Sequence, residues 1–171
     1  MKSPVNIVAA FGLVLGAVFG MAGTFVAQPN LQGLLWAIDG AGLVAAAAVL
    51  ALKFLRMEHE LVAAGFIVFA IAEAVMLSGT AGGPVASVPA FGAGTVLWAT
   101  ALLLISVPRH FPLLIRVLGV GSAIFFGITG ARIFWGEQIL PTSAPLPFYA
   151  YPVLVLTFIG WIWSLLREVE K

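Results

Sequence analysis

The feature that most constrains this chain is a series of six continuous apolar stretches separated by short turns, each stretch roughly 17 to 25 residues long. A stretch of that length is sufficient to cross the hydrocarbon core of a bilayer as an α-helix. Within lipid the backbone must satisfy its own hydrogen bonds, so only helices and closed barrels can span the membrane. Barrel strands would alternate in polarity over segments of roughly ten residues. The unbroken stretches therefore favour helices.

We predict an all-α integral membrane protein, a single domain formed by a six-transmembrane-helix bundle. Charged residues make up only 9% of the chain, against about 25% in soluble domains. The apolar run that ends at Ala27 is longer than that of a typical signal peptide, so we expect it to be retained as the first span. The breaker-rich segment from Thr80 to Pro89 predicts a loop. The predicted spans cover residues 5–27, 31–55, 61–79, 91–107, 113–135 and 148–166.

Basic residues gather on one side of the predicted bundle. That side, which also carries both termini, holds Lys2, Lys53, Arg56, Arg109, Arg116, Arg167 and Lys171. Arg132 is the only basic residue expected on the other side. Short loops rich in Lys and Arg stay in the cytoplasm, so we expect both termini to be cytoplasmic. The expected location is the inner (plasma) membrane of a bacterial-type cell, with the lipid bilayer as a partner.

A glycine pattern in the first span predicts close helix packing. Gly12, Gly16 and Gly20 are four residues apart and so share one helix face. Small residues let two helices approach closely, which is a main source of helix association in lipid. The face could bind a partner subunit or a second copy of the chain, or it could pack against a neighbouring span. The sequence leaves both alternatives open.

Charged residues within the predicted spans are the sharpest functional indication. Asp39 and Glu73 lie in the outer halves of the second and third spans, and Arg132 lies near the outer end of the fifth. A charged residue at such depth costs about 2.5–3.5 kcal/mol on the insertion scale and is rarely without an interior partner. Arg132 could turn inward to either carboxylate or reach out towards Glu137. Trp98, in the fourth span, could form a wall of the same site.

This set allows two interpretations. It could bind a proton, a cation or a small solute in a pocket that opens outward, or it could be an ion-paired brace with one acid protonated. The proline-rich segment 141–147, together with Tyr149 and Tyr151, could cover such a pocket or contact a partner. His59 and His110 are predicted at turns on the cytoplasmic rim, where solvent or lipid headgroups are more natural neighbours than a haem or a metal ion.

Composition and motifs exclude several functions. The chain has no cysteine, which excludes disulfides and thiolate metal sites, and its net charge of +1 gives no indication of nucleic acid binding. None of the common hydrolase, metalloprotease, phosphate-loop or dinucleotide-binding motifs is present. We therefore expect no cofactor, no metal and no catalytic residue, although Asp39 and Glu73 could in principle support acid–base chemistry.

Two functional hypotheses follow from the sequence. In the first, the protein binds or transports an ion or small solute through Asp39, Glu73 and Arg132, with Trp98 alongside. In the second, it is a non-catalytic accessory subunit of a larger membrane complex, joined through the glycine face. A chain of 171 residues with short loops would in either case act as a homo-oligomer or with a partner membrane subunit.

Overall fold

The computed structural model describes residues 3–167, and every regular element in this range is a helix. Six helices are long and apolar enough to cross a membrane. They are α1 (Pro4–Phe25), α2 (Pro29–Arg56), α3 (Glu60–Thr80), α5 (Val88–Ser106), α6 (Leu113–Phe134) and α7 (Ala150–Arg167). The prediction of an all-helical protein with six long apolar segments is confirmed. These helices indicate a multi-pass membrane protein in contact with lipid.

The connection between α3 and α5 is more ordered than the sequence predicted. Part of the expected loop forms a one-turn helix, α4 (Gly83–Ala86), and α5 already begins at Val88. Pro84 and Pro89 both fall in the first turn of a helix, where the missing N–H of proline has no partner to lose. Gly83 precedes the first of these prolines with φ +82°, a left-handed conformation that favours glycine.

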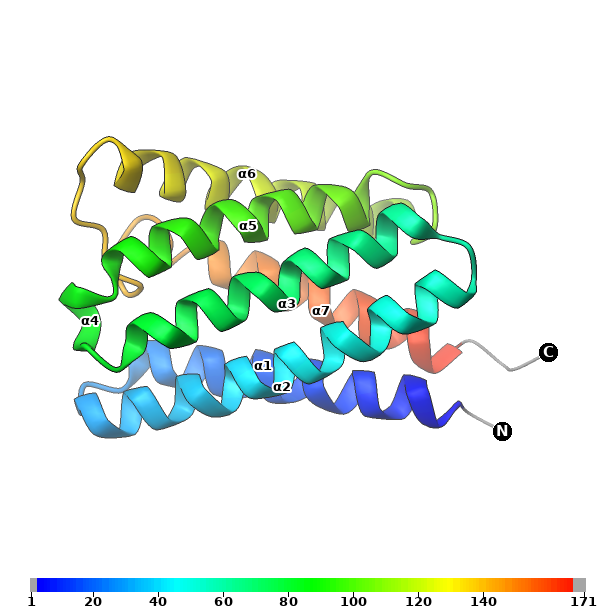
Figure 1. Ribbon diagram of the computed structural model, residues 1–171, viewed down its shortest axis with the longest axis horizontal. Helices are drawn as coiled ribbons and strands as arrows, with labels where there is room; N and C mark the ends of the chain where they lie inside the picture. Colours follow the sequence, from blue (N-terminus) through cyan, green and yellow to red (C-terminus); the bar gives the residue numbers. More distant parts are fainter. Residues whose placement is uncertain (1–2, 168–171) are drawn as a thin grey trace.

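The six long helices form a closed ring in which helices adjacent along the chain pack side by side. The order is α1, α2, α3, α5, α6 and α7, and α7 returns to pack against α1. Figure 1 shows the start of α1 and the end of α7 at the same end of the bundle. A hydrogen bond of 2.8 Å from Asn6 Nδ2 to the carbonyl oxygen of Leu165 joins these two ends. Lys2 and Lys171, predicted on this side, lie outside the described residues.

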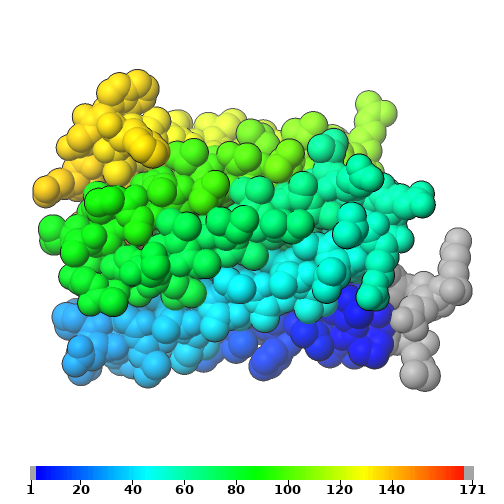
Figure 2. Space-filling view, in the orientation of Figure 1, coloured from blue at the N-terminus to red at the C-terminus, as the bar shows by residue number. Residues whose placement is uncertain are grey.

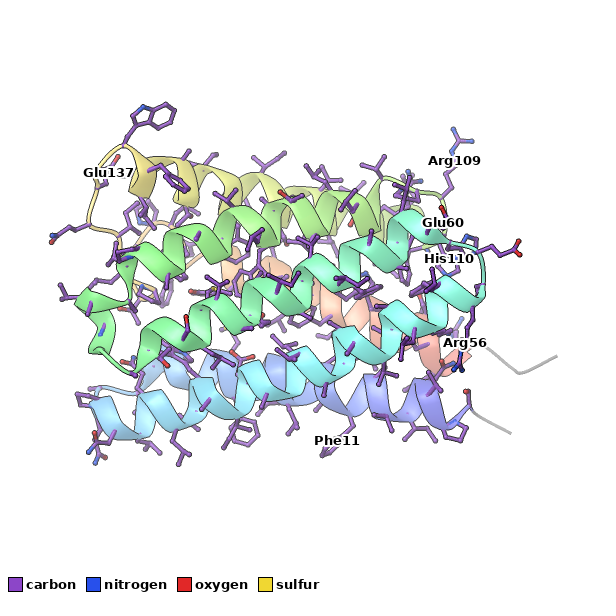
Figure 3. All side chains as sticks on the ribbon, in the orientation of Figure 1. Phe11, Arg56, Glu60, Arg109, His110 and Glu137 are labelled. Carbon is purple, nitrogen blue, oxygen red and sulfur yellow. The ribbon has the colours of Figure 1, made fainter. Side chains whose placement is uncertain are left out.

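Large apolar side chains cover the outside of the ring, and small residues lie where neighbouring helices touch. In α1, Ala9 and Gly12 are buried, whereas Phe11 is 64% exposed and points away from the bundle in Figure 3. The face of the bundle seen in Figure 2 shows α2, α3 and α5 in direct contact along their lengths. Small residues make such close contact possible where lipid gives helices no hydrophobic reason to associate.

The glycine face of α1 packs within the chain, against α2. A methyl group placed on Gly12 would lie 2.5 Å from the carbonyl oxygen of Gly42 and 2.9 Å from the Cβ atom of Ala46. Gly16 and Gly20 face Leu43 and Asp39 in the same way. Of the two alternatives left open by the sequence, the structure shows intramolecular packing.

The half of the bundle nearest the termini is filled by aromatic side chains from α2, α3 and α7. Phe54 and Phe66 stack with their ring centroids 5.5 Å apart, and Phe66 meets Trp161 edge-on at 5.2 Å. Phe69 and Phe158 continue the contact, also edge-on, at 5.9 Å. We call these five buried residues the inner aromatic cluster. It closes this half of the bundle and leaves the opposite half for a cavity.

Candidate functional site

A cavity of about 370 Å³ opens at the end of the bundle opposite the termini. Its walls come from α1, α2, α3, α5 and α7, and its mouth is formed by the α1–α2 turn, the α3–α4 connection and the segment between α6 and α7. Residues of the mouth include Pro29, Asn30, Ala81, Pro84 and Pro141. The turns at this end lie together at the left of Figure 1. The cavity is therefore a recess that enters the helix ring from this end.

Two carboxyl groups line the cavity well below its mouth. Asp39 is ten residues into α2 and Glu73 is seven residues before the end of α3, which corresponds to depths of about 15 Å and about 10 Å along the two helices. The carboxyl groups are close enough to interact electrostatically. The structure thus brings together the two acids that the sequence singled out, on adjacent antiparallel helices.

Glu73 is fixed against the wall of the cavity by Trp98. Only 3% of Glu73 is exposed, and its Oε1 atom accepts a hydrogen bond of 2.8 Å from the indole Nε1–H. The indole is held in turn by Phe69, which stacks on it with centroids 5.9 Å apart, and by Phe126, which meets it at 4.7 Å. A buried carboxyl group that accepts from a buried, packed donor has a single well-defined position.

Asp39 differs from Glu73 because nothing described in the protein holds its carboxyl group. Within residues 3–167 it has no hydrogen-bond or ion-pair partner. Room for it comes from Gly20 of α1, since a methyl group at that position would lie 2.9 Å from Asp39 Oδ2. The carboxyl group therefore lines the cavity with its hydrogen-bonding capacity unused.

Arg132 is not brought to the two carboxyl groups. It lies at the outer end of α6 and binds Glu137 through three hydrogen bonds, two of 3.0 Å from Nε and one of 2.5 Å from Nη2. Both side chains are more than 40% exposed, and Glu137 is labelled at this end in Figure 3. The hydrogen bonds from Arg132 lower the pKa of Glu137. Arg132 therefore reaches out towards Glu137 and does not turn inward to Asp39 or Glu73.

Tyr151 is a cavity residue that sequence reasoning placed only in a covering segment. It lies in the first turn of α7, lines the cavity and interacts electrostatically with both Asp39 and Glu73. Its ring meets those of Trp98 and Phe126 at 6.5 Å and 5.7 Å. The one available signal was a phenol at the start of an apolar span, and such residues are common at membrane interfaces.

The two histidines lie at the opposite end of the protein from the cavity. The rings of His59 and His110 are 4.7 Å apart, and Phe54 packs edge-on against His110 at the same distance. Figure 3 shows His110 at the end that also carries Arg56, Glu60 and Arg109. Within residues 3–167 no group of three or more His, Cys, Asp or Glu side chains could hold a metal ion.

Comparison of the chain with protein-family models, with curated proteins and with solved structures finds no match. The function must therefore be argued from the chemistry of the cavity.

Proposed function

We propose that this protein binds a positively charged ion or small solute in the cavity, at Asp39 and Glu73. The observation that carries the proposal is the sign of the charge available to a ligand. Two carboxyl groups line the cavity, and none of its described lining residues is Lys, Arg or His. Arg132, which the sequence offered as the positive partner of the two carboxyl groups, is bound to Glu137 at the surface.

A buried negative charge is stable in apolar surroundings only when a positive charge or several donors accompany it. Trp98 supplies one donor to Glu73, and Asp39 has no described partner. A cation in the cavity would give both carboxyl groups a positively charged partner. Without such a partner a buried carboxyl group takes up a proton, so a cation would bind here by displacing that proton. The cavity beside the two groups and the Asp39 carboxyl group, which has no described partner, support such a site over one that merely braces the helices.

The geometry supports binding more directly than transport. The inner aromatic cluster is buried and continuous below the cavity, so movement of a solute across the membrane would require these rings to separate. The accessory-subunit hypothesis drew on the glycine face, the very short loops and the near absence of soluble mass. Helix α2 covers the glycine face, which removes the first of these three arguments.

The proposal includes an orientation in the inner membrane. Lys53, Arg56, Arg109 and Arg167 lie at the end opposite the cavity mouth, and Arg132 is the described basic residue near the mouth. By the positive-inside rule the cavity opens to the outside. The solute would then reach Asp39 and Glu73 from the periplasmic or extracellular side.

Single cysteines introduced into this cysteine-free chain test the orientation. Gln28 is an exposed residue between α1 and α2, and Met57 is an exposed residue after α2 at the other end. In intact cells with an accessible inner membrane, a membrane-impermeant maleimide should label Gln28→Cys, and Met57→Cys only after permeabilisation. The reverse pattern would contradict the proposed orientation and place the cavity mouth in the cytoplasm.

The binding proposal is tested with purified protein in lipid nanodiscs. We expect at least one of rubidium, methylammonium and benzylammonium to bind saturably, as measured by tryptophan emission and thermal stability. Asp39→Asn should weaken that binding by about tenfold or more, which corresponds to about 1.4 kcal/mol. Glu137→Gln is the matched control, because it makes the same carboxyl-to-amide change outside the cavity. Absence of binding by every cation, or equal binding by Asp39→Asn, would overturn the proposal.

A further inference from the structure

We propose that the ligand is an organic ammonium ion with an apolar body, whose charged group lies at Asp39 and Glu73. This inference rests on the proposed function and specifies the class of cation. Three properties of the cavity support it. They are its volume, the small number of carboxyl groups available to a metal ion, and the hydrogen bonds that several of its side chains already donate to the backbone.

The cavity has the volume of a site for a small organic molecule. At about 370 Å³ it falls at the lower end of the roughly 300–1,000 Å³ range of such pockets, whereas one water occupies about 30 Å³ of liquid. A bare inorganic ion at the two carboxyl groups would leave most of this volume unfilled by ligand. The remaining walls are largely apolar and include Leu43, Met76, Phe91, Leu154 and Phe158.

The acidic ligands are too few for a dedicated metal site. Hard cations such as Ca²⁺ take about six to eight oxygen ligands arranged around the ion. The cavity offers two carboxyl groups, and the described residues contain no cluster of three metal-binding side chains. An ammonium group needs only acceptors for its N–H donors, and aromatic faces add to its attraction. Trp36, Tyr151 and Phe158 place aromatic rings along the walls.

Several polar side chains around the cavity already donate a hydrogen bond to a backbone carbonyl oxygen. These bonds run from Thr24 to Gly20, from Gln32 to Gly23, from Thr80 to Leu77 and from Ser87 to Pro84. Their remaining lone pairs, together with the oxygens of ionised carboxylates, accept hydrogen bonds, and the Tyr151 hydroxyl and the Trp36 indole N–H are donors that also line the cavity. A ligand that donates hydrogen bonds and carries positive charge matches this surface, and an alkylammonium group does both.

The test compares benzylammonium with three probes that each lack one of its features. Benzyl alcohol has the apolar ring without the charge, methylammonium has the charge without the ring, and rubidium is a bare ion. We expect benzylammonium to bind wild-type protein about tenfold or more tightly than each of the other three. Asp39→Asn should remove this preference over benzyl alcohol, and Glu137→Gln should retain it.

A cavity-narrowing variant tests where the apolar body lies. Val155 of α7 lines the cavity and carries no polar group. Val155→Phe should weaken benzylammonium binding by about tenfold and leave methylammonium binding unchanged within about twofold. Equal effects on the two probes would place the ring outside the cavity and overturn the inference.

The same ammonium chemistry occurs in free amines and in aminolipid headgroups, and the lipid of the nanodisc separates these sources. Competition by phosphatidylethanolamine, absent in phosphatidylglycerol discs and abolished by Asp39→Asn, would identify a lipid headgroup as the source of the ammonium. Binding that is equal in both lipids would identify a free amine. Either result supports the inference.

The outcomes also distinguish this inference from the proposed function. If rubidium or methylammonium binds as tightly as benzylammonium and depends on Asp39, the site recognises cations but the organic body plays no part. The inference then fails and the proposed function stands. If benzyl alcohol binds as tightly as benzylammonium, the charge plays no part in binding this ligand and the inference fails. If no cation binds at all, both fail.

Discussion

Gly12→Ala is expected to destabilise the bundle, although alanine is the better helix former. Gly12 and Gly42 are the point at which the backbones of α1 and α2 meet, and an added methyl group would lie 2.5 Å from a carbonyl oxygen that cannot rotate away. Forcing extra volume into a packed contact costs about 1–3 kcal/mol. We expect a loss of this size in the free energy of unfolding, measured in mixed micelles.

Gly121→Ala provides the matched control. Gly121 lies within α6, and a methyl group there would meet no atom within 4 Å. The same substitution should therefore leave stability unchanged or raise it by up to about 1 kcal/mol through helix propensity. Gly12→Leu should prevent folding altogether. If Gly12→Ala left the isolated chain as stable as Gly121→Ala, the contact between α1 and α2 would not be that of the structure.

The helices were predictable because a span can be recognised from the hydropathy of one continuous stretch of sequence, without knowledge of its neighbours in space. Hydropathy over about twenty residues is sufficient to recognise a span, and the prolines at positions 29, 89 and 112 mark the start of three helices. The rotation of each helix about its axis was not predictable in this way. Nearly all side chains of a span are apolar, so the sequence could not show that Gly12 faces α2.

The acidic part of the site was predictable and its surroundings were not. Asp39 and Glu73 stand out because a carboxyl group at membrane depth is costly, and Trp98 was predicted only as a possible wall of the same site. Arg132 has a long side chain with two directions available, and only the three-dimensional position of Glu137 decides between them. The sequence treated Gly20 and Asp39 as separate features, whereas in the structure the glycine makes room for the carboxyl group.

Three substitutions of the Glu73–Trp98 pair are expected to separate ligand binding from helix bracing. Glu73→Gln keeps an oxygen that can accept from the indole Nε1–H, so the 2.8 Å hydrogen bond can be retained while the charge is lost. We expect the free energy of unfolding to change by less than about 1 kcal/mol. Benzylammonium binding should weaken by about tenfold or more, because the cation loses one of its two carboxylates.

Glu73→Leu removes the acceptor as well as the charge. The indole N–H of Trp98 then remains buried without a partner, which costs about 1–3 kcal/mol. Trp98→Phe removes the donor instead and leaves Glu73 unsupported in its buried position. Both variants should therefore lose stability. The double variant should lose less than the sum of the two, because neither group is left without its partner.

The contrast between Glu73→Gln and Glu73→Leu carries the conclusion. If Glu73 served only as a brace, Glu73→Gln would bind every cation as the wild type does, and stability would be the only property to change across the series. If Glu73 serves a ligand, Glu73→Gln separates the two properties, because binding falls while the fold persists. Glu137→Gln should change neither, since that carboxyl group is exposed and lies outside the cavity. Loss of cation affinity without loss of stability is therefore the result that a binding site at this position requires.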